Sequence, residues 1–118
     1  LVGVTVLTSL NKNNLVDLGF NSSAEEITVK LAKLGKQNGI DGVVCSIEDI
    51  SGIKASLGGD FLSVTPGVRM LQDNGDQKRA GSIYDAIQFG TDFVVIGREI
   101  TEAKNPEGVL KKIESLIV

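Results

Sequence analysis

The sequence predicts an α/β fold in which four buried parallel strands alternate with helices along 118 residues. Continuous apolar runs bounded by glycines are typical of strands buried on both faces, as in a parallel sheet that helices cover. The composition, with 42% hydrophobic and 4% aromatic residues, indicates the aliphatic interior of one small domain. The four predicted strands are residues 4–8, 42–45, 61–65 and 93–96.

The clearest predicted helix follows the first strand. Ser23-Ala24-Glu25-Glu26 is a capping box, in which a serine and a glutamate three positions later satisfy each other's backbone N–H groups. Ile27, Leu31 and Leu34 then fall on one face at the helical period, which predicts that this face is buried. Asn38-Gly39 predicts the end of the helix, because these residues accept the left-handed backbone that closes a helix.

Three further helices have start and stop signals of their own. The second has Ser46 as its cap and runs to Leu57, and the third begins at Ser82 and ends at Gly90. The fourth has Asn105 as its cap and a proline at the first helical position, where the missing N–H costs nothing. The residues expected to face the interior are Ile47, Ile50 and Ile53 in the second helix and Val109, Leu110, Ile113 and Leu116 in the fourth.

An internal echo supports repeated strand and helix units. Residues 39–46 and 90–97 share a Gly-x-Asp-x-Val-Val spacing, in which a helix-ending glycine leads into a strand. Such units leave two architectures open, a small open doubly wound sheet or half of an eight-stranded (β/α)8 barrel. Half a barrel has two unpaired edges and a bare inner face, so it needs its other half. The sequence period alone does not choose between them.

Composition and charge exclude several partners. The net charge of −3 argues against a general nucleic-acid surface, which needs a basic face. No apolar stretch approaches the roughly 18 residues of a membrane span, so neither nucleic acid nor membrane is expected. The single cysteine fits a reducing cytoplasm. A start without methionine or signal-peptide features leads us to expect a chain that has been cut.

The residue types present also narrow the chemistry. Cys45 lies on an apolar predicted strand, and without a histidine to form its thiolate it is interpreted as a small core residue. The lack of histidine also argues against a serine-type triad and a zinc site. No pair of carboxylates falls convincingly at a strand end, so no metal is predicted.

The arginines indicate a phosphorylated small molecule. All three lie between residues 69 and 98, and Arg69 and Arg98 come just past predicted strands that end near a glycine. This pattern places backbone N–H groups and a planar, charged guanidinium group at one rim of a sheet, which suits a phosphate dianion. In a (β/α)8 barrel the phosphate commonly lies beyond strands seven and eight. The alternative interpretation of each strand end is a glycine that only forms a turn and an arginine that only forms a surface ion pair. Two such strand ends that follow each other in the sequence favour the phosphate site.

Other residues fall on the same rim. Thr8 ends the first predicted strand, where its hydroxyl could bind a ligand or cap the next turn. Pro66-Gly67 restricts and then frees the backbone after the third strand. The polar stretch from Val68 to Gly81 is long for a βα turn and is interpreted as a lid, in which Gln77 could reach between phosphate and substrate body. The charges at positions 78 and 79 are more simply solvated loop charges.

Five segments carry a resemblance to a known family. They are residues 4–10, 39–46, 64–69, 75–79 and 95–101. Together and in this order they resemble bacterial orotidine 5'-phosphate decarboxylase, although one Gly-Arg rim alone recurs among many phosphate-binding barrels. The resemblance spans the C-terminal half of that enzyme. It implies that residues 1–118 form strands five to eight, with their helices, of a (β/α)8 TIM barrel whose N-terminal half is absent from this chain.

The resemblance also implies a function. It is the cofactor-free decarboxylation of orotidine 5'-phosphate to uridine 5'-phosphate in pyrimidine biosynthesis, by a cytoplasmic homodimer with its sites at the subunit interface. The residues implied to contact the substrate are Thr8 near the pyrimidine, Pro66 in the wall of the base pocket, Arg69 in the phosphate-gripping loop, Gln77 between phosphate and pyrimidine, and the Gly97 amide and Arg98 guanidinium on the phosphate.

The family's catalytic segment is missing from this chain. That segment is an Asp-x-Lys-x-x-Asp motif whose lysine stabilises and protonates the carbanion, and the nearest match here, Asp76-Gln77-Lys78, has Gly81 in place of the last aspartate. No catalytic residue is therefore assigned. Three interpretations stay open: the C-terminal part of a decarboxylase, another phosphate-binding barrel enzyme such as a sugar-phosphate aldolase or decarboxylase relative, and a catalytically empty half-barrel that binds a ligand or another chain.

Overall fold

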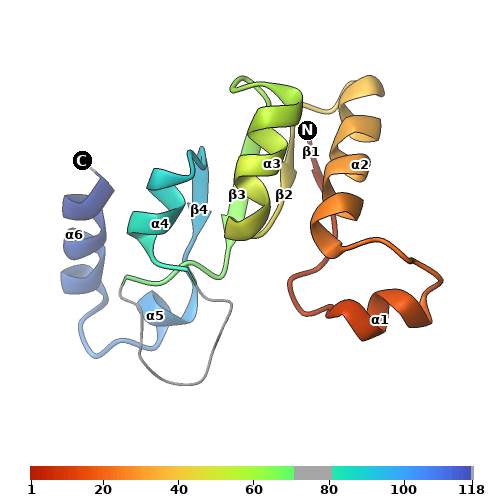
Figure 1. Ribbon diagram of the computed structural model, residues 1–118. Helices are drawn as coiled ribbons and strands as arrows, with labels where there is room; N and C mark the ends of the chain where they lie inside the picture. The colour runs from red at the N-terminus through yellow and green to blue at the C-terminus, as the bar shows by residue number, and fades with distance from the viewer. Residues whose placement is uncertain (71–80, 118) are drawn as a thin grey trace.

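The computed structural model describes residues 1–70 and 81–117 (Figure 1). It confirms an α/β fold with four parallel strands. In chain order the elements are β1 (Val2–Val4), α1 (Lys12–Asp17), α2 (Ala24–Gln37), β2 (Gly42–Val44), α3 (Ile47–Leu57), β3 (Leu62–Pro66), α4 (Ile83–Gln88), β4 (Phe93–Val95), α5 (Arg98–Thr101) and α6 (Pro106–Ile117).

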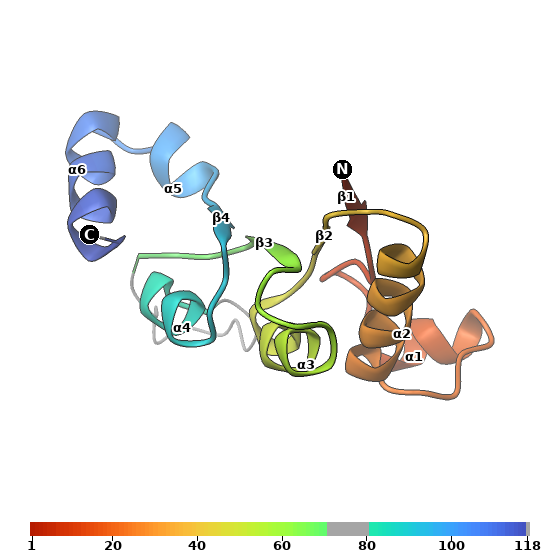
Figure 2. The same cartoon turned by 90° about the horizontal axis from the view of Figure 1, so that it is seen from above.

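The sheet is wound in one direction. Its strand order is β1-β2-β3-β4, and every neighbouring pair is parallel. Viewed from above, α2, α3 and α4 all lie on the same side of the sheet (Figure 2). A doubly wound sheet reverses its strand order at a switch point and carries helices on both faces. The described part of the chain therefore has the topology of successive units of a barrel rather than that of a doubly wound sheet.

The face of the sheet under these helices holds the core. Val43, Cys45, Ser63 and Thr65 point to this face, and each is at most 1% exposed. The helices bring Ile50, Ile53, Ile83 and Ala86 onto it, all fully buried. The core is thus built from short aliphatic side chains, as the low aromatic content predicts.

The opposite face of the sheet is open. The parallel register aligns Val4, Val44, Val64 and Phe93 on this face. At the two edges its side chains are exposed, with 65% for Val4 and 56% for Phe93. The prediction of strands buried on both faces is wrong for β1 and β4, because the side chains of Val2, Val4, Phe93 and Val95 are exposed. We call the apolar side chains Val2, Val4, Phe93 and Val95 the open face.

Serine caps start the three helices that cover the sheet. Ser23, Ser46 and Ser82 each form a capping box with a carboxylate three residues later, which confirms all three predicted helix starts. A glycine with positive φ follows each of these helices, Gly39 after α2, Gly58 after α3 and Gly90 after α4, with φ of 87°, 90° and 82°. Both parts of the Gly-x-Asp echo therefore have the same structure, a helix end that leads into a strand.

α2 buries only part of the face that was predicted. Ile27 is buried at 5%, as predicted, but Leu31 and Leu34 are 41% and 56% exposed, whereas Thr28 and Ala32 are fully buried. Small residues bring this helix close to its neighbours: a Cβ added to Gly35 would lie 2.3 Å from Ile40 Cδ1. Close approach selects small side chains for the contact face, so the largest apolar residues do not mark it.

Part of the predicted core of α6 is also exposed. Ile113 is buried at 6%, as predicted, but Leu110 and Leu116 are 43% and 50% exposed. α6 lies beyond β4, at the end of the sheet (Figure 2), and no strand in the described residues pairs with the outer edge of β4. α6 therefore lies at the edge where a further strand would extend the sheet.

The first strand is shorter and earlier than predicted. β1 ends at Val4, and Thr5 makes the last contact with β2 when its hydroxyl donates to the Val44 carbonyl at 2.7 Å. Residues 6–8 then leave the sheet, which corrects the predicted strand at 4–8. Two short helices were not predicted, α1 with an Asn11 cap and the four-residue α5 directly after β4.

Candidate functional site

The carboxyl ends of the strands form an open pocket of about 310 Å³. Its lining comes from the loop after β1, the starts of α2 and α3, Pro66-Gly67 at the end of β3, and Gly81. Parallel strands bring these ends to one edge, which is where α/β proteins bind ligands. The pocket lining includes Thr8, Leu10, Ser46, Asp49, Pro66 and Gly81.

Two of the predicted substrate contacts line this pocket together. Thr8 is exposed and lies on the loop after β1, and Pro66 is half-buried at the end of β3. They are 58 positions apart in the sequence, and the sheet order brings them to the same rim. One is a hydroxyl and the other an apolar ring, so the pocket offers both a polar and a flat apolar contact to a ligand.

Arg69 sits just beyond this pocket, with its backbone held on both sides. Its N–H donates to the Gly81 carbonyl at 3.1 Å, and its own carbonyl accepts from the Ile83 N–H at 2.8 Å. Val68 before it is only 3% exposed. The two ends of the expected lid are therefore joined at their base. Gln77 and the rest of residues 71–80 lie outside the described residues.

Gly97 and Arg98 form the start of α5 at the end of β4. Arg98 is exposed, and Gly97 is the N-cap, with no side chain to satisfy the first-turn N–H groups. The starts of α2 and α4 differ, since the Ser23 and Ser82 side chains accept from backbone N–H groups there. The start beside Arg98 has no N-cap side chain that could satisfy its backbone donors.

Glu99 is a residue that the sequence did not single out. Its carboxylate accepts a hydrogen bond from the Met70 N–H at 2.9 Å, across 29 positions of the chain. It thereby joins the segment after β4 to the segment after β3, and each segment carries one of the two predicted phosphate arginines. Nothing in the sequence marked this bond, because an acidic residue in a first helical turn is common for local reasons.

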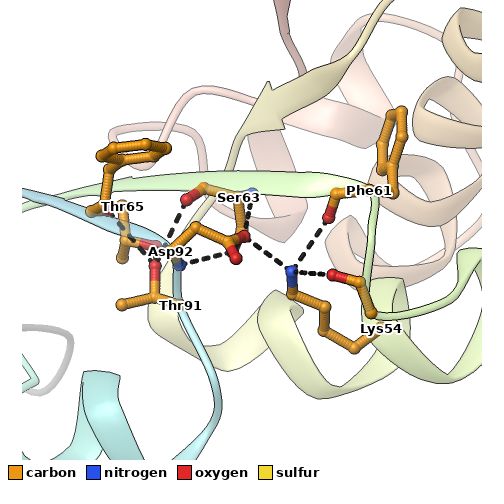
Figure 3. A network of polar contacts seen from close by, with 8 residues as sticks. Lys54, Phe61, Ser63, Thr65, Thr91 and Asp92 are labelled. Atoms are coloured by element: carbon orange, nitrogen blue, oxygen red, sulfur yellow. Dashed lines mark hydrogen bonds and ion pairs between the residues drawn. The ribbon is translucent and has the colours of Figure 1, made fainter.

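A second polar cluster lies at the opposite, amino end of the strands (Figure 3). Asp92 Oδ2 accepts from Lys54 Nζ at 2.6 Å, from the Ser63 N–H at 2.7 Å and from the Ser63 hydroxyl at 2.9 Å. Lys54 also donates to the Phe61 and Gly59 carbonyls. Beside it, the Thr65 and Thr91 hydroxyls are 2.7 Å apart. We call these residues the Asp92 cluster. Its place at the amino end indicates a role in stability.

The electrostatics of the two ends differ. Burial alone would raise the pKa of Asp92, but hydrogen bonds from Lys54 and Ser63 outweigh it and hold that pKa below its ordinary value. Burial, with the Asp49 carboxylate nearby, raises the pKa of Cys45 to about 12. Cys45 is 1% exposed, which confirms the prediction that it is a core residue.

Neither a metal cluster nor a membrane-spanning helix is found in residues 1–70 and 81–117. No three His, Cys, Asp or Glu side chains there are arranged to hold a metal ion. No helix in this part of the protein combines the length and the apolar character needed to cross a bilayer.

Comparison with known proteins places the chain in a family. The model of the orotidine 5'-phosphate decarboxylase / HUMPS family matches residues 1–113. An orotidine 5'-phosphate decarboxylase of Vibrio parahaemolyticus is 48% identical over 114 residues, which are 96% of this chain and 49% of that protein. One from Neisseria meningitidis is 41% identical, over 96% of this chain and 47% of that protein.

A solved structure agrees with the sequence matches. The crystal structure of orotidine 5'-phosphate decarboxylase from Lactobacillus acidophilus superimposes with a TM-score of 0.82 at 31% identity, over 98% of this chain and 47% of that one. The chain spans about half the length of the curated relatives it matches. By sequence and by fold, it belongs to the orotidine 5'-phosphate decarboxylase / HUMPS family.

Proposed function

We propose that residues 1–118 are the C-terminal half of a (β/α)8 barrel that decarboxylates orotidine 5'-phosphate to uridine 5'-phosphate in pyrimidine biosynthesis. The observation that carries this proposal is the parallel sheet with strand order β1-β2-β3-β4, whose open face and unpaired edges require a partner half. The chain also matches only about half of each relative. We refer to this chain together with that half as the complete barrel. Where needed, the unmatched half of the Vibrio parahaemolyticus enzyme can supply it.

The role of this half is to bind the substrate away from the reacting carbon. Thr8 and Pro66 contact the pyrimidine, while Arg69, Gln77, Gly97 and Arg98 contact the phosphate. Loss of carbon dioxide leaves an electron pair on the ring carbon, and a proton must then reach that carbon. The lysine and aspartates for these steps come from the other half. Phosphate binding contributes energy that closes and orders the site in the transition state.

The phosphate site has the clearest physical support. Arg98 is an exposed, permanently charged side chain at a helix start whose N-cap is a glycine. Backbone N–H groups and a guanidinium fork at one rim suit a dianion. The serine caps of α2 and α4 already bind backbone N–H groups, which makes those two helix starts weaker competitors for the same anion.

Replacing Arg98 tests this site. In the complete barrel, Arg98→Ala should weaken the binding of uridine 5'-phosphate by about 1.5–3 kcal/mol, the range for hydrogen bonds to charged groups. Thermal stability should change little, because the side chain is exposed. Titration calorimetry with uridine 5'-phosphate and with uridine measures the difference. Uridine lacks the phosphate and should bind Arg98→Ala and wild type alike.

A matched variant controls for net charge. Lys104→Ala removes one positive charge from the exposed segment after α5 and should leave both affinities unchanged. Equal losses for uridine and uridine 5'-phosphate in Arg98→Ala would place Arg98 outside the phosphate site. If Lys104→Ala weakened the binding of uridine 5'-phosphate as much as Arg98→Ala does, Arg98 would act only through its contribution to the electrostatic potential of the protein.

We further propose that the complete barrel is a cytoplasmic homodimer and that α1 lies in its interface. Val16, Leu18 and Phe20, on α1 and directly after it, are 51%, 63% and 46% exposed. Figure 1 shows α1 set apart from the sheet, and thus away from the open face that the other half would cover. Exposed apolar side chains that gather on one segment are typical of an interface.

A charge in this surface should separate the subunits. Leu18→Asp should convert a dimer into a folded monomer at low micromolar concentration, because an aspartate would lose its hydration in the interface. Sedimentation equilibrium measures the mass, and circular dichroism confirms the fold. Leu34→Asp, on the exposed side of α2, is the control and should leave the dimer intact. An unchanged dimer in Leu18→Asp would remove α1 from the interface.

A further inference from the structure

Glu99 connects two strand ends that carry arginines. Its Oε2 accepts from the Met70 N–H at 2.9 Å, and both residues are half-buried. A hydrogen bond from a backbone N–H to a carboxylate is charge-assisted, so it is stronger than one between neutral groups. Met70 directly follows Arg69, and Glu99 directly follows Arg98. The bond therefore fixes the spacing of two backbone segments that each present an arginine.

The Arg69 segment has few other ways to move. Its backbone is already bound on the α4 side, through the Gly81 carbonyl and the Ile83 N–H. Arg69 and Ser82 thus form a short parallel bridge outside the main sheet. Glu99 adds a bond on the α5 side, and the Met70 N–H is the last main-chain donor before residues 71–80. The segment is held from two sides at the point where the chain leaves it.

We propose that Glu99 is a positioning residue, which holds the Arg69-Met70 segment against the Gly97-Arg98 segment so that both arginines meet one phosphate. This inference rests on the proposed function. Its physical basis is preorganisation: two guanidinium groups on independently mobile segments must be ordered when the ligand binds, and that ordering weakens the affinity. A bond made before the ligand arrives removes much of this cost.

The sign of the effect separates positioning from simple electrostatics. A carboxylate beside a phosphate site repels a dianion, so removal of its charge alone would strengthen phosphate binding. Removal of a positioning bond would weaken it. Because the two influences oppose each other, weaker binding after loss of Glu99 reports the positioning role.

The test compares variants of the complete barrel. Glu99→Ala should weaken uridine 5'-phosphate binding about 5- to 20-fold and raise the KM for orotidine 5'-phosphate by a similar factor, with a smaller change in kcat. Uridine should bind unchanged. Glu99→Gln keeps an oxygen that can accept from Met70 and should stay within about threefold of wild type, as a rescue by a neutral acceptor. Glu102→Ala removes an exposed carboxylate at the other end of α5 and should have no effect.

Several outcomes would overturn the inference. Unchanged or tighter binding of uridine 5'-phosphate by Glu99→Ala would show that the bond does not position the arginines. Equal losses for uridine and uridine 5'-phosphate would indicate a general structural role, and so would a Glu99→Gln variant as weak as Glu99→Ala. A wild-type protein that binds uridine 5'-phosphate no better than uridine would overturn the proposed phosphate site, and the inference with it. That result is distinguishable because it needs no variant.

Discussion

The 118-residue chain by itself should leave orotidine 5'-phosphate intact, whereas the complete barrel should decarboxylate it. The chain contains neither a histidine nor an Asp-x-Lys-x-x-Asp segment, so it has no group placed to stabilise and protonate a carbanion. Binding at a remote phosphate cannot replace that charge array, because it stabilises the transition state only together with groups at the reacting carbon. The expected difference is the full catalytic effect, which exceeds a millionfold for typical enzymes, roughly 8 kcal/mol or more.

The loss of ultraviolet absorbance of orotidine 5'-phosphate measures this reaction. The two halves, mixed or joined in one chain, should restore turnover, and neither alone should exceed buffer. When this half carries Arg98→Ala, mixing it with the other half should restore less activity than the wild-type half does, mostly because the KM for orotidine 5'-phosphate is higher. The proposal would be contradicted if the isolated chain decarboxylated orotidine 5'-phosphate and Lys78→Ala abolished that activity. Lys78 would then be catalytic.

Loss of the Asp92 carboxylate should destabilise the fold more than any change at the phosphate site. Asp92→Ala would leave Lys54 Nζ without its ionic partner and remove three hydrogen bonds to one carboxylate oxygen. The side chains of Lys54 and Asp92 are only 17% and 28% exposed, so water replaces these bonds poorly. We expect a loss of about 2–4 kcal/mol in the free energy of unfolding, measured by urea denaturation of the complete barrel.

The same cluster should make stability depend on pH. The folded-state pKa of Asp92 is lower than its ordinary value, so its contribution is complete above that value of about 3.9 and is lost as pH falls towards the folded-state pKa. The gap in unfolding free energy between wild type and Asp92→Asn should therefore narrow as the pH is lowered from about 6 to about 3. A gap that stays constant or widens on acidification would contradict this.

Two controls isolate the cluster. Asp60→Asn changes an exposed aspartate near the same end of the sheet and should cost less than about 0.5 kcal/mol. Lys54→Met with Asp92→Asn completes a double-mutant cycle, in which the pair should show coupling of about 1 kcal/mol or more. Additive effects would mean that the two side chains act independently despite their contact.

Local signals located the helices that cover the sheet because their chemistry is local. α3 has a serine cap, isoleucines at positions 47, 50 and 53, and a glycine after Leu57, and all of these features act within a few residues. The buried face of α2 was predicted only in part, since its packing depends on the room that Gly35 leaves for the Ile40 side chain. A period of apolar residues does not report where a neighbour leaves room only for small side chains.

The sequence predicted that Thr8 and Pro66 lie on one rim, and the sheet order brings both to one pocket. The strand expected at 4–8 ended early because Val6 and Leu7 line that pocket instead of the sheet, and an apolar run looks the same in either place. The bond between Glu99 and Met70 joins residues 29 positions apart, so no local pattern encodes it.

The open face of the sheet has a consequence for how such a protein is made. If this half follows the other in one chain, the earlier half has already left the ribosome when these residues appear. At about 5–20 residues per second, this segment takes roughly 6–24 s to emerge. Each new strand can then pack against the earlier half as it emerges, so the side chains of Val4 and Phe93 are exposed to solvent only briefly. The earlier half, by contrast, exposes the apolar inner face of its own sheet to solvent during that interval. Chaperones should therefore bind the earlier half in preference to this one.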